Sequence, residues 1–239
     1  MKYITGKKRR RVVIKLSGST FSQDVNSKNF IRKYAQMLSD ISNNIQPIVI
    51  AGGGKIARYY IELARTLGSD EATLDIMGIE VSRLNARLLI VGIGDLAYPY
   101  VPKNLEEVAI AAESGKIVVA GGLYPGQSTN ATSALIAETV KASTFLNATD
   151  VDGIYDSDPN RNKNAKLFKK ITVQECMEIL KTGNSMAGTY DLMDIIALKV
   201  IERSKIPTRV LLSDVVTIKN AISGENHIGT EIIPVRKQS

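Results

Sequence analysis

The chain has 239 residues and a hydrophobic fraction of 44%, enough for one large α/β domain with a sizeable core. One cysteine (Cys176) and one histidine (His227) exclude a disulfide within the chain and any zinc site built from several such ligands. The net charge of +7 raises nucleic-acid binding as a function class, but aromatic residues make up only 5% and do not alternate with basic residues as a stacking surface requires.

Short β-branched runs alternate with amphipathic stretches along the chain. The runs predict strands at 11–16, 47–51, 117–120, 143–147 and 208–212. The stretches between them predict helices at 28–43, 55–67, 71–91, 104–114, 131–141, 172–181 and 192–204. This alternation favours an α/β fold with a mostly parallel sheet and helices on both faces. The segment 156–170, rich in Asp, Asn and Lys, is expected to be an exposed hairpin or loop.

Several features predict a cytoplasmic protein. A single thiol is most simply explained by a reducing compartment. The N-terminal region carries a basic run at 7–11, followed by a short strand rather than an apolar signal sequence. No apolar stretch approaches the ~20 residues that a membrane helix needs. The positive charge gathers at 7–11 and 161–170, and an enzyme that handles anionic phosphates also benefits from it.

The first predicted strand carries Lys15 and runs into Ser17-Gly18-Ser19. Burial of a lysine in an apolar strand is costly unless its ammonium reaches a partner at the strand end. Gly18 lets the backbone approach a ligand closely, and successive N–H groups can hold a phosphate. The pattern favours a phosphate site, although not of the P-loop type, in which the lysine follows the glycines. The alternative is a lysine at a strand edge beside a flexible turn.

The second strand runs into Gly52-Gly53-Gly54 and then a helix that carries Arg58. Free N–H groups and the positive end of a helix dipole form an anion site. Arg58 lies about one turn into the helix and can face the same anion. The alternative is a tight turn followed by a solvated arginine.

Two further segments offer polar groups to a ligand. Asp75, in a mostly apolar helical stretch, can meet sugar hydroxyls, or it can be an exposed acid beside Asp70 and Glu71. The loop 121–130 follows the third strand and provides hydrogen-bonding side chains for a base and a phosphate. Ser128 or Thr129 in that loop can also simply cap the next helix.

Acidic residues follow the fourth strand, in Thr149-Asp150-Val151-Asp152-Gly153-Ile154-Tyr155 and then Asp158. The carboxyl ends of strands in open α/β sheets are where ligands bind. Carboxylates there can hold magnesium on a nucleotide, and the Tyr155 ring can line a base pocket. The alternative is an ordinary Asp-Gly turn. Near 188–194, Asp191 or Asp194 can orient a catalytic group or merely favour a helix N-terminus.

Together these segments resemble the amino-acid kinase family and, within it, the archaeal-type uridylate (UMP) kinases. The resemblance covers residues 11–234 and rests on KLSGS, GGGKIAR, the DxxG at 75–78, GLYPGQSTNA, TDVDGIYDSDP and GTYDLMD. It implies a three-layer αβα sandwich in a single domain, 1–239, with an acceptor lobe (11–147) and an ATP lobe (148–234). It implies transfer of the γ-phosphoryl group of MgATP to UMP, UTP as an inhibitor and a homohexamer.

The resemblance also implies roles for individual residues. The catalytic residues are Lys15, Asp152 and Asp194. The ATP-binding residues are Lys15, Leu16, Ser17, Gly18, Ser19, Gly54, Arg58, Thr149, Tyr155 and Asp158. The UMP-binding residues are Gly53, Asp75, Leu123, Tyr124, Pro125, Gly126, Gln127, Ser128 and Thr129. Magnesium is expected to arrive with ATP, and its protein ligands are left open.

Two other functions stay open on the same fold. One is a kinase of another small acid or phosphate, such as acetylglutamate or isopentenyl phosphate. Isopentenyl phosphate kinases resemble this pattern but carry a histidine after the glycine loop, where this chain has Ile56-Ala57-Arg58, which favours a nucleotide acceptor. The other is a non-catalytic nucleotide sensor, which the presence of Lys15 and Asp152 disfavours.

Overall fold

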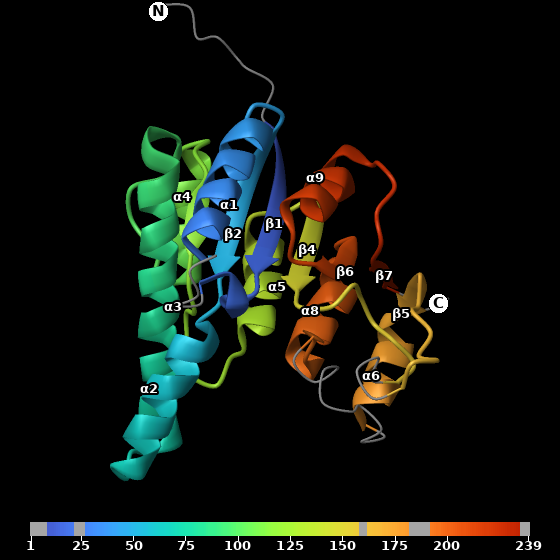
Figure 1. Cartoon of the computed structure of the whole chain (residues 1–239). Helices are drawn as coiled ribbons and strands as arrows, with labels where there is room; N and C mark the ends of the chain where they lie inside the picture. Colours follow the sequence, from blue (N-terminus) through green and yellow to red (C-terminus); the bar gives the residue numbers. More distant parts are fainter. Residues whose placement is uncertain (1–8, 22–26, 158–161, 182–191, 235–239) are drawn as a thin grey trace, which may run out of the picture.

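The computed structural model describes residues 9–21, 27–157, 162–181 and 192–234 (Figure 1). Within these residues a seven-stranded sheet has the strand order β3-β2-β1-β4-β6-β7-β5. Its strands are β1 Arg10–Leu16, β2 Ile45–Ala51, β3 Val118–Ala120, β4 Thr144–Thr149, β5 Lys170–Thr172, β6 Thr208–Leu212 and β7 Thr230–Ile233. The ladders from β3 to β6 are parallel, and β7 pairs with β6 in the antiparallel direction. The prediction of a mostly parallel sheet is confirmed.

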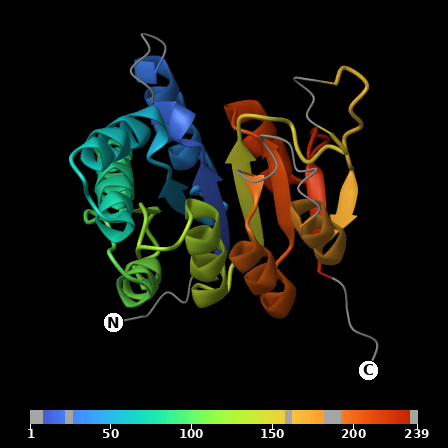
Figure 2. The same ribbon diagram turned by 90° about the horizontal axis from the view of Figure 1, so that it is seen from below.

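Helices cover both faces of the sheet. They are α1 Ser27–Ile41, α2 Gly54–Thr66, α3 Glu71–Ile93, α4 Leu105–Glu113, α5 Thr129–Thr139, α6 Val173–Lys181, α8 Ile195–Ser204 and α9 Val215–Ser223, with short 3-10 turns η1 Gly18–Phe21 and η2 Gly94–Leu96. Figure 2 shows α1 and α9 on one side of the sheet and α5 and α8 on the other. The fold is therefore the expected αβα sandwich. Within the described residues, no helix is both long enough and apolar enough to cross a membrane.

The core has two halves, one under each helical layer. Along β1, Val12, Ile14 and Leu16 pack with α1, α3 and α9, while Val13 packs with the opposite layer. A strand buried on both faces needs apolar side chains at successive positions, which explains the near-continuous apolar runs. Lys15 interrupts this apolar run at the penultimate residue of the strand.

Each of the five predicted strands and seven predicted helices corresponds to an element of the structure. The structure adds β5, β7 and α9, which were not predicted from the sequence. The segment 156–170 forms a hairpin in its described part, because Tyr155 bridges Leu167 and the Asp156 N–H donates to the Lys166 carbonyl. The division into lobes at residue 147 stays a prediction, since β1 and β4 pair across it in one continuous sheet.

Three consecutive arginines occupy the amino edge of the sheet, where parallel strands begin and the helices between them end. Arg9 donates to the carbonyls of Ser42, just after α1, and Gly115, just after α4. Arg10 donates to the Ile222 carbonyl in the last turn of α9 at 2.6 Å. The carbonyls at a helix C-terminus have no partner within the helix and carry partial negative charge. The basic run therefore stabilises helix ends.

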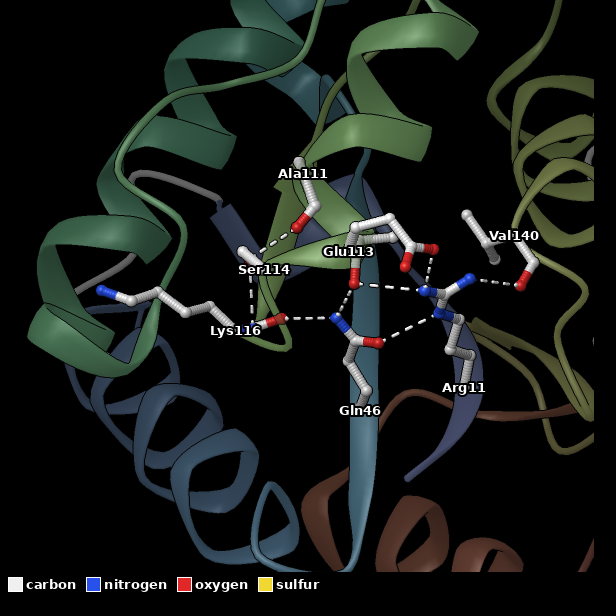
Figure 3. Close-up of polar contacts among 8 residues, drawn as sticks. Arg11, Gln46, Ala111, Glu113, Ser114, Lys116 and Val140 are labelled. Atoms are coloured by element: carbon white, nitrogen blue, oxygen red, sulfur yellow. Dashed lines mark hydrogen bonds and ion pairs between the residues drawn. The ribbon is translucent and has the colours of Figure 1, made fainter. Parts of the chain in front are cut away.

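Arg11 and its strand neighbour Gln46 extend this arrangement into the interior (Figure 3). The Arg11 guanidinium donates to the Val140 carbonyl beyond α5 at 3.1 Å and to the Ala112 carbonyl of α4 at 3.3 Å. It also pairs with Glu113 at 2.6 Å and donates to Gln46 Oε1 at 3.1 Å. The Gln46 amide in turn donates to the Ala112 carbonyl at 2.7 Å. The ends of α4 and α5 are thus joined to the neighbouring strands β1 and β2.

Candidate active site

A cavity of about 710 Å³ lies at the opposite, carboxyl edge of the sheet. The loops after β1, β2 and β4, the middle of α3 and the N-termini of α2, α5 and α8 surround it. It brings together many of the residues singled out from the sequence: Lys15, Ser17, Gly18, Ser19, Gly53, Gly54, Arg58, Asp75, Gly126, Gln127, Ser128, Thr129, Thr149 and Asp194. Their roles toward particular ligands stay predictions.

Lys15 enters the cavity from the centre of the sheet. It pairs with Ile50 of β2 on one side and Asn147 of β4 on the other, and it is only 7% exposed. A buried ammonium is costly unless it meets negative charge. Lys15 also lines the cavity, so an anion bound where the strands end would lie close to its ammonium group.

The glycines beside Lys15 are required by packing as well as by ligand access. A Cβ on Gly18 would lie 2.1 Å from the Gly54 nitrogen, and Gly54 itself has a φ of +67°. The loops after β1 and β2 therefore touch through their backbones, which only glycine permits here. This contact fixes the start of α2 against η1. The N-cap residue of α2 is Gly53, which has no side chain to cap the first turn, so the helix keeps the character of an anion site.

Ser128 and Asp194 join two helix N-termini at the cavity. The Ser128 hydroxyl accepts the Ala131 N–H at 3.0 Å and so caps α5. Asp194 caps α8, where its Oδ1 accepts the Ala197 N–H at 2.8 Å. Its other oxygen, Oδ2, accepts a hydrogen bond from the Ser128 hydroxyl. Asp194 therefore caps α8, which is one of the two alternatives predicted for it, and its role in orienting a catalytic group stays a prediction.

Asp75 reaches from α3 to the loop that follows β3. Its Oδ2 accepts the Gly126 N–H at 2.6 Å, so one carboxylate oxygen is already engaged. Next to Gly126, the Gln127 Oε1 atom is buried and has no hydrogen-bond partner among the described residues. A buried acceptor atom that lacks a hydrogen-bond partner at a cavity is suited to accept a hydrogen bond from a ligand.

Other predicted site residues do not line the cavity. The side chains of Leu16 and Leu123 are buried in the core, so only their backbones remain for ligand contact. Tyr124 is 38% exposed, and Pro125 is adjacent to it in the same loop. Asp158 and Asp191 lie outside the described residues.

Asp152 and Tyr155 form a separate pair beside the cavity. The Tyr155 hydroxyl donates to Asp152 Oδ2 at 3.4 Å. Partial burial, together with the negative charge of Asp152, raises the pKa of Tyr155. Asp152 therefore contacts the hydroxyl of the tyrosine that is predicted to line the base pocket, and its catalytic role stays a prediction.

Several residues that line the cavity had no individual role in the sequence interpretation. Asp150 is the most informative, because its Oδ1 accepts a hydrogen bond from the Ser19 hydroxyl at 2.6 Å. It lies within the acidic segment after β4, so its position was a usable signal. Asn130 and Ser82 also line the cavity. Asn130 follows directly on the predicted loop residues, whereas nothing in the helical pattern around Ser82 indicated a site.

Comparisons with known proteins agree with this arrangement. The model of the amino acid kinase family matches residues 10–211. The uridylate kinase of Methanothermobacter thermautotrophicus is 44% identical over 94% of this chain and 99% of its own. That of Sulfurisphaera tokodaii is 45% identical over 84% of this chain and 89% of its own.

Solved structures give the same assignment. The crystal structure of the uridylate kinase from Archaeoglobus fulgidus superposes with a TM-score of 0.82 at 40% identity, covering 92% of this chain and 99% of that one. The UMP kinase from Ureaplasma parvum shares the fold, with a TM-score of 0.78 at 24% identity over 94% and 99% of the two chains. With a matching family model over most of its length and close relatives over nearly all of it, the chain belongs to the amino acid kinase family.

Proposed function

We propose that the protein is a UMP kinase, which transfers the γ-phosphoryl group of ATP to UMP and yields ADP and UDP. The observation that carries the proposal is the near full-length match to uridylate kinases at 39–46% identity. The cavity agrees with it, because one space joins the loops after β1 and β2 to the loop after β3 and to the end of β4. Two phosphorylated ligands can therefore meet within it.

The reaction asks for positioning and charge stabilisation more than for proton transfer. A UMP phosphate oxygen is already an anion and a competent nucleophile, so no general base is required. Two anions must approach each other, and Lys15, Arg58 and the N-terminus of α2 supply positive potential at one edge of the sheet. Asp194 has both oxygens engaged with Ala197 and Ser128, which fits a positioning role.

Magnesium is expected to enter with ATP. Within the described residues no group of three or more His, Cys, Asp or Glu side chains could form a site made of protein alone. Asp150, at the cavity wall beside Ser19, is a suitable carboxylate, because Mg²⁺ is typically bound by one or two carboxylates together with substrate phosphates. Bound there, Mg²⁺ would neutralise charge on the phosphates.

An acceptor screen tests the proposal. We expect ADP release in the presence of MgATP with UMP, and little with acetylglutamate or isopentenyl phosphate. Phosphorylation of one of these other acceptors instead would identify a different kinase of this family. Tight UMP binding without ADP release would identify a non-catalytic sensor.

We propose that UTP inhibits by occupying the UMP pocket. Its uridine would meet the same groups as UMP, including Asp75, and its additional phosphates would extend toward Lys15. Inhibition should therefore be competitive with UMP and should weaken in Asp75→Asn in step with UMP binding. Inhibition that UMP cannot overcome and that Asp75→Asn leaves intact would indicate a separate effector site.

We also propose a homohexamer and a cytoplasmic location. An exposed apolar stripe on α3, formed by Leu84, Leu88 and Val91, supports self-association, since such stripes are rarely left to solvent. Light scattering on the purified protein measures the assembly, and Leu88→Glu is expected to reduce its size. The single cysteine, Cys176, is buried and fits a reducing compartment.

A further inference from the structure

The loop after β3 lies unusually close to the middle of α3. A Cβ on Gly121 would fall 2.6 Å from the Arg83 nitrogen, and a Cβ on Gly122 would fall 2.9 Å from Ile79 Cγ1. A side chain at Gly121 would require the loop or the helix to move, and one at Gly122 would require at least the Ile79 side chain to shift. The loop 121–127, which we call the acceptor loop, therefore packs directly against the α3 backbone at its first two residues.

Two adjacent residues of α3 then fix the orientation of this segment. The Ser82 hydroxyl accepts the Gly122 N–H at 2.7 Å and donates to the Ile79 carbonyl at 2.7 Å. Arg83 Nε donates to the Gly122 carbonyl at 3.1 Å, and its terminal nitrogen donates to the Leu123 carbonyl at 3.2 Å. Both backbone polar groups of Gly122 are thus held by α3.

Arg83 is suited to this task because its guanidinium is a rigid, planar set of donors. It contacts two successive carbonyls of the acceptor loop, and a third, that of Lys103, lies at 3.3 Å. Its side chain is only 18% exposed, whereas its ion-pair partner Glu80 is 62% exposed. The carbonyl contacts, rather than the ion pair, therefore account for its placement.

The same helix holds the far end of the acceptor loop. Asp75, about two turns before Arg83, accepts the Gly126 N–H at 2.6 Å. Two side chains of one helix, an acid and a base, thus hold opposite ends of the loop. Tyr124 and Pro125 lie between these two ends. Gln127 and Ser128 follow directly after Gly126 and line the cavity wall.

We propose that Arg83 is a positioning residue for the acceptor, which acts through the acceptor loop without touching the reacting atoms. By fixing the carbonyls of Gly122 and Leu123, it sets the path of the loop and hence where Gln127 and Ser128 meet the ligand. This inference rests on the proposed function in naming UMP as that ligand. It predicts that loss of Arg83 impairs UMP binding and spares ATP binding.

Three variants of the full chain test the inference. Arg83→Ala is expected to raise KM for UMP by at least tenfold while KM for ATP stays within twofold. Arg83→Lys retains the charge and one donor group, so its KM for UMP should fall between those of the wild type and Arg83→Ala. Glu80→Gln removes the ion pair but leaves the carbonyl contacts, and it should behave as the wild type.

A ligand-free measurement separates this inference from the proposed function. Amide hydrogen exchange of peptides covering 121–127 should be at least fivefold faster in Arg83→Ala than in the wild type, with exchange in β1 and β2 unchanged. Equal rises in both KM values, an unchanged KM for UMP, or unchanged exchange in the loop would overturn the role of Arg83. If the wild type does not phosphorylate UMP, the proposed function fails, while faster exchange would still support the hold of Arg83 on the loop.

Discussion

The two edges of the sheet contain opposite ends of the helices and different kinds of residues. At the carboxyl edge, helices begin, glycine loops meet through their backbones and Lys15 lies beside an open cavity. At the amino edge, helices end, and Arg9, Arg10 and Arg11 donate directly to their terminal carbonyls. Positive charge is present at both edges, and at the amino edge the carbonyls at the helix ends are its partners.

The role of a basic residue in such a fold therefore depends on the edge of the sheet at which it lies. A parallel strand and the antiparallel helix beside it place negative helix ends at the amino edge and positive helix ends at the carboxyl edge. Arginines at the amino edge therefore compensate the negative helix ends, and cations at the carboxyl edge add to the positive potential of the helix N-termini. The net charge of +7 raised nucleic-acid binding as a function class, and part of that charge lies in the basic run 7–11. The three described arginines of this run all donate to carbonyls at helix ends.

Lys15→Met should give the largest effect, because it removes a cation from the wall of the cavity in which the phosphates are proposed to meet. We expect turnover to fall about 10²–10³-fold, by analogy with the loss of one preorganised donor to developing charge. UMP affinity and the melting temperature should change little. Lys219→Met, at an exposed ion pair with Asp40, is the matched control and should leave turnover unchanged. Near-normal turnover in Lys15→Met would contradict its assignment.

Arg11→Ala should have the opposite profile. The variant loses hydrogen bonds to the ends of α4 and α5 from a side chain that is only 12% exposed. We expect about 2–4 kcal/mol of destabilisation from the loss of charge-assisted hydrogen bonds. The melting temperature should drop by roughly 5–15 °C for a chain of this size. Turnover measured well below the transition should match that of the wild type.

A loss of turnover in Arg11→Ala without a loss of stability would contradict the structural role of Arg11 at the amino edge. Arg65→Ala serves as its control, because Arg65 pairs with Glu62 and Glu71 on the surface. Such exposed pairs contribute less than about 1 kcal/mol. Thermal unfolding of the two variants, followed by calorimetry, measures the difference.

Asp75→Asn tests a carboxylate at the functional edge that serves the loop and the ligand together. The variant should weaken UMP binding by between about tenfold and a hundredfold, the value of a hydrogen bond to a charged group. ATP affinity should stay nearly constant. Glu71→Gln, an exposed acid on the same helix, is the control for the lost charge. Equal losses for the two nucleotides in titration calorimetry would place Asp75 elsewhere in the mechanism.

Arg10→Ala should give the smallest effect. Its comparison with Arg11→Ala tests whether burial controls how much each arginine at the amino edge contributes to stability. Arg10 is exposed and makes one contact, with the Ile222 carbonyl. Surface substitutions of this kind usually change stability by within about 0.5 kcal/mol. Chemical denaturation should show a shift much smaller than that of Arg11→Ala. A shift of similar size would mean that burial does not control the contribution of these arginines.

The central part of the fold could be predicted from sequence because its strands are buried on both faces. The elements that were not predicted are short or atypical. β5 has three residues and β7 has four, too few for a periodic pattern. The helix α9 begins with Val215-Val216-Thr217, which favour strands, and becomes helical through its cap Asp214 and the packing of Ile218.

The candidate site could be predicted wherever chemistry is concentrated in a short segment, as in the glycine loops and the acidic run. It could not be predicted where a residue acts through distant backbone. Arg83 contacts carbonyls 39 and 40 positions away, and a lone arginine on a helix gives no local signal of such contacts. Gly18 was expected to admit a phosphate, and its contact with Gly54 became visible only in three dimensions.

The central position of β1 has a consequence for synthesis of the chain. β1 is the first strand made, and one of its edges pairs with β2, but its other edge waits for β4, which begins at Thr144. Until then the nascent chain presents an apolar strand with an open edge, the usual template for aggregation. The hydrogen bond of Arg10 can form only later still, because its acceptor Ile222 lies 212 positions further along the chain. Contacts so distant in sequence form slowly, so this part of the amino edge is completed only after Ile222 has been synthesised.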